Sequence, residues 1–128
     1  MSTYEKATVE SILDAKTTKP GQNLVEIDVP SIEMTFVVSK MPLTKVLRII
    51  DETADPSSVV GNYEFLKKII YESVPVLKNK RLLQHYECVE PTDIVEKIFN
   101  DNAAAIGDFG RKILALYGLD ELPDMLKN

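Results

Sequence analysis

The fold of this chain is decided by residues 62–118, which read NYEFLKKIIYESVPVLKNKRLLQHYECVEPTDIVEKIFNDNAAAIGDFGRKILALYG. Apolar residues recur in this stretch at intervals of three and four, which places them on one face of a helix. Pro75 and Gly118 stand where a helix stop and a left-handed C-terminal cap are expected. The pattern predicts four short helices in series, over Asn62–Val74, Lys80–Tyr86, Thr92–Asn100 and Asn102–Tyr117.

The last predicted helix carries an unusual number of small residues. Gly107 and Gly110 each cost about 1 kcal/mol relative to alanine inside a helix. Together with the run Ala103–Ala105 they leave one side of the helix nearly bare. We therefore expect another helix, from this chain or from a partner, to approach it closely. We expect the core side of the helix to be formed by Ile106, Phe109, Ile113, Leu116 and Tyr117.

Alternating apolar residues precede the helical stretch. Residues 24–39 alternate with period two, which predicts two strands joined by a turn at Pro30 and Ser31. That turn lacks the glycine or asparagine of a tight hairpin, so antiparallel pairing is expected but the register stays open. A two-stranded hairpin is only marginally stable alone. Either one face packs on the helices, or the free edge, near Met34 and Phe36, pairs with another copy of the chain.

The helix that joins the hairpin to the helical stretch should start just after Pro42, which suits a first helical turn. The helix is expected to end before Asp55-Pro56, because the residue preceding a proline is pushed out of the helical region. Its predicted buried stripe consists of Leu43, Val46, Leu47 and Ile50.

These elements together predict an α+β fold that is mainly α, with an N-terminal β-hairpin followed by a bundle of about five short helices. The expected organisation is a flexible segment over 1–23, a single globular domain over 24–118 and a C-terminal tail over 119–128. Within the first segment, the spacing of Val9, Ile12 and Leu13 suffices for one or two helical turns.

Composition limits the classes of function. The chain has 128 residues, a net charge of -5 and a pI near 4.9, which argues against tracking of nucleic-acid phosphates. Its most basic segment, around Lys78, Lys80 and Arg81, has no interleaved aromatic residues and is interpreted as a solvated helix start. The polar N-terminus lacks the apolar core of a secretory signal, and no apolar run approaches the roughly 18 residues of a membrane span. We expect a cytoplasmic protein without nucleic-acid or membrane partners.

No catalytic constellation is visible. His85 and Cys88 could supply half of a zinc site, but the chain contains no second histidine or cysteine to complete one. Asp51, Glu52 and Asp55 form a small acidic group at a helix end, without the spacing of a calcium loop. The five glycines are dispersed and form no phosphate-binding loop. The sequence predicts a protein that is not an enzyme and has no metal or cofactor.

Several short phrases occur in a characteristic order along the chain. They are the two strands from Val25, the entry Met41-Pro42-Leu43-Thr44, the segment 78–86, Pro91-Thr92-Asp93-Ile94-Val95 and the closing Leu116-Tyr117-Gly118-Leu119. In this order and at this length, from about residue 24 to residue 119, the chain resembles the XkdN-like tail assembly chaperones of tailed bacteriophages and phage-derived elements.

This resemblance implies a non-enzymatic assembly factor that is made in the host cytoplasm and is absent from the mature virion. Its partners would be the long, helical tape measure protein, which it would coat and keep soluble, and the tail tube protein, whose assembly it would promote. We expect the stripes of the helical stretch to form core. The apolar residues expected to contact a partner are Leu119, Leu122, Met125 and Leu126.

Two other classes of function stay open. One is a structural or adaptor component of a phage tail that assembles as a homo-oligomer through the hairpin edges near Met34 and Phe36. The other is a small enzyme that uses Asp51, Glu52, His85 or Cys88.

The resemblance also raises a hypothesis about the gene. Many phage tail chaperones are made in two lengths by a programmed ribosomal frameshift near the end of the shorter reading frame. Leu126-Lys127-Asn128 can be encoded as UUA-AAA-AAY, which contains a slippery A-AAA-AAY sequence. Reading the codons tests this hypothesis, because an AAG codon for Lys127 removes the site.

Overall fold

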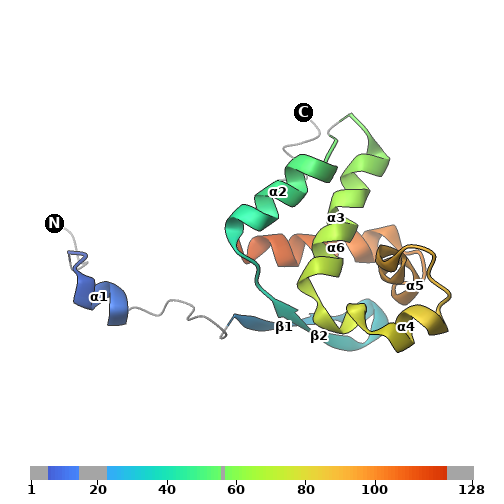
Figure 1. Cartoon of the computed structure of the whole chain (residues 1–128), viewed down its shortest axis with the longest axis horizontal. Coiled ribbons are helices and arrows are strands. Elements are labelled where there is room, and N and C mark those ends of the chain that lie inside the picture. The colour runs from blue at the N-terminus through green and yellow to red at the C-terminus, as the bar shows by residue number, and fades with distance from the viewer. Residues whose placement is uncertain (1–5, 15–22, 56, 121–128) are drawn as a thin grey trace.

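A computed structural model describes residues 6–14, 23–55 and 57–120 of the chain. It has the predicted α+β, mainly α fold: a hairpin near the N-terminus is followed, in the described part, by five α-helices (Figure 1). In chain order the elements are α1 Val9–Asp14, β1 Leu24–Val29, η1 Pro30–Ile32, β2 Met34–Ser39, α2 Leu43–Thr53, α3 Val59–Ser73, η2 Pro75–Lys78, α4 Lys80–His85, η3 Pro91–Asp93, α5 Ile94–Ile98 and α6 Ala103–Ala115, where η marks a 3-10 helix.

The hairpin has an unambiguous register. β1 and β2 pair antiparallel from Leu24 opposite Ser39 to Val29 opposite Met34. The connection is longer than the expected Pro30-Ser31 turn, because η1 is followed by Glu33 in the left-handed conformation at φ 53°. This extra length is how the chain reverses without a glycine at the turn. Since side chains alternate along a strand, one face of the hairpin is apolar and the other is mixed.

The apolar face of the hairpin lies on the helices. β1 contacts α6, and β2 contacts η2. Three rings meet in this core: the centroid of Phe36 on β2 lies 6.4 Å from that of Phe99 and 5.5 Å from that of Phe109. The hairpin is therefore held by the helices, which is the first of the two alternatives that its length allowed.

Helix α3 is the centre of the bundle and packs against α2, α5 and α6. The expected close approach to the last helix occurs at Gly110, where an added Cβ would lie 2.8 Å from Cδ2 of Leu66. Gly107, by contrast, faces open space. The completely or almost completely buried side chains of the core include Phe65, Ile69, Ile70, Leu77, Ile94, Phe99, Ile106, Phe109, Ile113 and Leu114.

Some helix boundaries and faces differ from the prediction. Helix α3 starts at Val59, three residues before Asn62, because the side chain of Ser58 caps it by accepting a hydrogen bond from the N–H of Gly61. Helix α6 ends at Ala115, and Leu114 joins the buried side chains beside Ile113.

The buried stripe of α2 is also rotated from the predicted one. Val46, Ile49 and Ile50 are buried, whereas Leu43 and Leu47 are 51% and 43% exposed. The spacing of three and four fits both stripes equally well, so only the contact with α3 decides between them.

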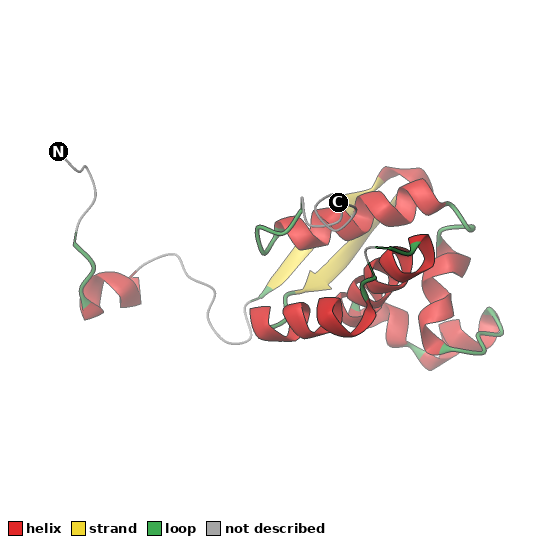
Figure 2. Ribbon diagram, turned by 90° about the horizontal axis from the view of Figure 1, so that it is seen from above, coloured by secondary structure: helices red, strands yellow, loops and turns green. Residues whose placement is uncertain are grey.

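The two ends of the chain are described in part. The predicted helical turns around Val9 form α1, which stands apart from the rest of the described chain in both views (Figures 1 and 2). The predicted flexible residues 1–5 and 15–22, and the tail beyond Asp120, lie outside the described residues. Of the predicted N-terminal segment, Asn23 is bonded to the body.

Candidate partner-binding surfaces

The residues predicted to bind partners differ in burial, and some of them lie outside the described part of the chain. Leu119 is half-buried and packs against the core, while Leu122, Met125 and Leu126 lie outside the described residues. Met34 is 55% exposed at the turn end of the hairpin, but Phe36 is only 6% exposed within the ring cluster. The pleat turns the side chain of Phe36 into the core, so at this residue only the backbone edge is available for the predicted self-association.

The first and last segments of the folded body, at Asn23 and Tyr117, meet at one place immediately before α2. The side-chain amide of Asn23 donates to the carbonyl of Lys40 at 2.6 Å, and the N–H of Lys40 donates to the carbonyl of Asn23 at 2.9 Å. The N–H of Met41 donates to the hydroxyl of Tyr117 at 2.7 Å. The segment before Asn23 and the tail after Leu119 therefore both start beside the N-terminal end of α2.

The first candidate surface is formed by Leu43 and Leu47 and is called the α2 surface. The two residues are four apart, so they lie on the same side of the helix, next to its buried stripe. Both side chains are about half exposed although both are large and apolar. Because Leu43 follows Met41 by two residues and Leu119 follows Tyr117 by two, the α2 surface and Leu119 lie at the same end of the molecule.

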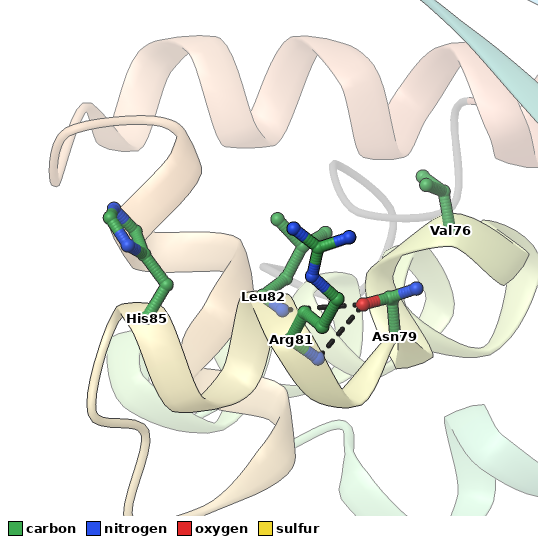
Figure 3. Close-up of a pocket in the computed structure, with 5 residues that line it drawn as sticks. All are labelled: Val76, Asn79, Arg81, Leu82 and His85. Carbon is green, nitrogen blue, oxygen red and sulfur yellow. Dashed lines mark hydrogen bonds between the residues drawn. The ribbon is translucent and has the colours of Figure 1, made fainter.

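The second candidate surface is a groove of about 480 Å³ along α4, called the α4 groove (Figure 3). Asn79 builds one end, because its side-chain oxygen caps α4 by accepting hydrogen bonds from the N–H groups of Arg81 at 2.9 Å and Leu82 at 3.4 Å. Val76, 52% exposed, and Leu82, half-buried, supply apolar contact area. Arg81 and His85 are exposed, four residues apart on the same side of α4. The groove therefore combines an apolar lining with a rim that carries the guanidinium of Arg81 and the imidazole of His85.

Two charge clusters on α3 hold the bundle together. Lys67, with a side chain only 7% exposed, has its ammonium 3.1 Å from Glu96, 3.4 Å from Glu64 and 3.9 Å from Asp93. Burial alone would lower the pKa of Lys67, but the hydrogen bond to Glu96 and the charges of Glu64 and Glu96 outweigh burial and raise it. Burial and the hydrogen bond with Glu96 raise the pKa of Tyr63 as well. This cluster ties α3 to η3 and α5.

The second cluster surrounds Glu72. Its carboxylate lies 3.2 Å from the ammonium of Lys78, 3.5 Å from that of Lys45 and 3.6 Å from that of Lys68. Burial raises the pKa of Glu72, but the Lys78 hydrogen bond and the three ammonium charges outweigh burial and lower it. The cluster ties α3 to α2 and η2. Both clusters are satisfied within the fold and are interpreted as structural.

The residues considered for chemistry do not converge. His85 is exposed with its ring edge-on to Tyr86, and Cys88 is half-buried. Burial, with the nearby charge of Asp93, raises the pKa of the Cys88 thiol, which disfavours a thiolate nucleophile. Asp55 accepts hydrogen bonds from the N–H and hydroxyl of Ser57, which lower the pKa of its carboxyl.

Within residues 6–14, 23–55 and 57–120, His, Cys, Asp and Glu side chains form no group of three or more that could hold a metal ion. Among the same residues, no helix has the length and apolar character needed to cross a bilayer.

Comparisons with family models, with curated proteins and with solved structures find no match for this chain. The α2 surface and the α4 groove therefore have to be interpreted from their own chemistry.

Sequence reasoning missed both surfaces. The spacing of Leu43 and Leu47 is the same as that of buried residues, so the sequence predicts that both lie in the core. The α4 groove depends on how η2 turns after Pro75 and sets Val76 next to α4, which no local pattern reports. The exposed Arg81 and His85, four apart, were the only signal in the sequence.

Proposed function

We propose that this chain is a tail assembly chaperone of a tailed bacteriophage or prophage, which binds the tape measure protein, keeps it soluble and promotes assembly of the tail tube. In this proposal the protein acts in the host cytoplasm, is not an enzyme and is absent from the mature virion. The phrases and order of elements that resemble the XkdN-like chaperones supply the partner's identity.

The observation that carries the proposal is the α2 surface. Leu43 and Leu47 present apolar side chains one helical turn apart. They lie beside the place where Asn23 bonds to Lys40 and Tyr117 bonds to Met41. Two residues at this spacing match the apolar row of an amphipathic helix laid alongside. A tape measure protein is a long succession of such helices, and the tail residues Leu119, Leu122, Met125 and Leu126 would extend the contact from the same end.

Co-expression of this chain with a tape measure protein tests the proposal. We expect that protein to be soluble and to co-purify with the wild-type chain. The double variant Leu43→Gln/Leu47→Gln should lose both effects, since it removes the apolar contact from an exposed site without opening the core. The matched control is Val59→Gln/Val60→Gln, which changes two exposed valines at the start of α3. This variant should still keep the long protein soluble and co-purify with it.

Two results would contradict the proposal at different levels. If the long protein stays insoluble with the wild-type chain and never associates with it, the chaperone function is wrong. If Leu43→Gln/Leu47→Gln acts as well as the control, the function stands but the α2 surface is not the binding site.

One feature favours a second function, a structural or adaptor component of the tail. The sheet has two strands in the described part, so each strand has an edge that no described strand covers. The outer face of the hairpin exposes Leu24 and Val37, which are diagonal neighbours in the register. Mass spectrometry of purified particles separates the two functions: stoichiometric presence favours the structural component, and absence favours the chaperone.

A further inference from the structure

Helix α1 is a formed amphipathic helix that covers nothing in the described structure. Val9, Ile12 and Leu13 recur at intervals of three and four and are 69%, 58% and 73% exposed. The helix is nevertheless capped at its start. The N–H of Thr8 donates to Oγ of Ser11 at 2.7 Å, and the N–H of Ser11 donates to Oγ1 of Thr8 at 3.1 Å. Such reciprocal bonding satisfies two N–H groups at the start of the helix.

The α4 groove is complementary to α1. Its apolar contact area comes from Val76 and Leu82, and its rim carries Arg81 and His85. Among the described residues, the guanidinium of Arg81 has no acidic partner, and the carboxylate of Glu10 on α1 has no basic partner. The apolar row of α1, flanked by a carboxylate, therefore matches in character an apolar groove that is flanked by the guanidinium of Arg81.

We propose that α1 of one copy of this chain docks into the α4 groove of a second copy, with Val9, Ile12 and Leu13 on the apolar lining and Glu10 against Arg81. This interaction surface concerns α1 and α4 alone, and it holds or fails independently of the chaperone function.

The position of the groove favours a second copy over the same chain. In the described structure α1 stands apart from α4 of its own chain (Figures 1 and 2). Nine steps separate the Cα atoms of Asp14 and Asn23, which allows a reach of at most about 30 Å. The helix of another copy is not limited by this reach.

A charge-swap experiment on the full-length chain tests the inference by its molar mass in solution, measured by light scattering over a range of concentrations. The wild-type chain should self-associate, and less so in high salt. Glu10→Lys and Arg81→Glu should each weaken association by about tenfold, because each places like charges together. An equimolar mixture of the two variants should regain it, since the altered helix of one fits the altered groove of the other. Lys80→Glu, beside the groove rim, is the matched control and should behave as wild type.

The outcomes are separable. A wild-type chain that stays monomeric at every concentration overturns the inference. Failure of the equimolar mixture to regain association also overturns it, because the helix of one variant then does not occupy the groove of the other. Loss of association by Leu13→Ser, with no loss by the exposed Val59→Ser, supports it; equal behaviour of these two variants counts against it. Since α1 lies outside the core, none of its variants endangers folding.

Discussion

The packing of α6 on α3 predicts opposite effects for two glycines on the same helix. Gly107→Ala and Gly110→Ala make the same chemical change within one turn of α6. A methyl group added at Gly107 meets no atom within 4 Å, whereas one added at Gly110 lies 2.8 Å from Cδ2 and 3.5 Å from Cβ of Leu66. Leu66 is itself buried, so it cannot turn away without moving other core side chains.

The magnitudes follow from these contacts. Both variants gain up to about 1 kcal/mol of helix propensity. Gly107→Ala should keep that gain and raise the melting temperature by about 4 °C in a chain of this size. Gly110→Ala adds a methyl group to a filled core, where overpacking costs about 1–3 kcal/mol, so its net effect should lie between zero and about 2 kcal/mol of lost stability.

Urea unfolding followed by far-UV circular dichroism measures both variants against the wild type. In a Leu66→Ala background the difference between the two glycine sites should shrink, because the atom that Gly110→Ala contacts is gone. Equal stabilisation by Gly107→Ala and Gly110→Ala in the wild-type background would refute the close contact of α3 and α6.

Three further predictions concern the body of the fold. Tyr117→Phe should lower the free energy of unfolding by about 1–2 kcal/mol in urea, because it removes the acceptor of the Met41 N–H; an unchanged value contradicts that bond. Glu72 has a lowered pKa in the folded state, so its stabilisation is present above its ordinary pKa of 4.5 and is lost as the pH falls through the folded value. Glu72→Gln should accordingly flatten the fall in stability between pH 4.5 and lower pH, and an acid limb as steep as that of the wild type argues against the cluster. Phe36→Ala should cost about 3–5 kcal/mol and Met34→Ala less than about 1 kcal/mol, since only the first is in the core; similar costs would mean that the strand faces are reversed.

Patterning predicted the elements of the fold but not how they face one another. The alternation of residues 24–39 and the helical spacing of residues 62–118 are local properties, and the hairpin and the helices form where these patterns lie. The predicted buried face of α2 was partly wrong, because residues 43–50 fit two overlapping helical patterns. The contact with α3 decides which of the two is buried. Helix α3 starts early because Ser58 caps it, although Val59, Val60 and Gly61 have low helix propensity.

Local sequence patterns did not predict the polar contacts between residues far apart in the chain. Lys67 looks like an exposed helical lysine, yet it is buried because Asp93 and Glu96, far along the chain, are brought to its ammonium. The junction of Asn23 with Lys40 and of Met41 with Tyr117 joins three distant segments in the same way. The α2 surface lies beside this junction, so its place in the molecule becomes visible only in three dimensions.

Hydrogen–deuterium exchange tests whether the α2 surface binds the long helical partner. Deuterium uptake by the full chain is compared alone and with the co-purified tape measure protein. The account predicts slower uptake on binding in α2 (Leu43–Thr53) and in the neighbouring residues 114–120, with no change at the start of α3 near Val59. Binding that leaves the uptake of α2 unchanged, or no binding at all, would contradict the account.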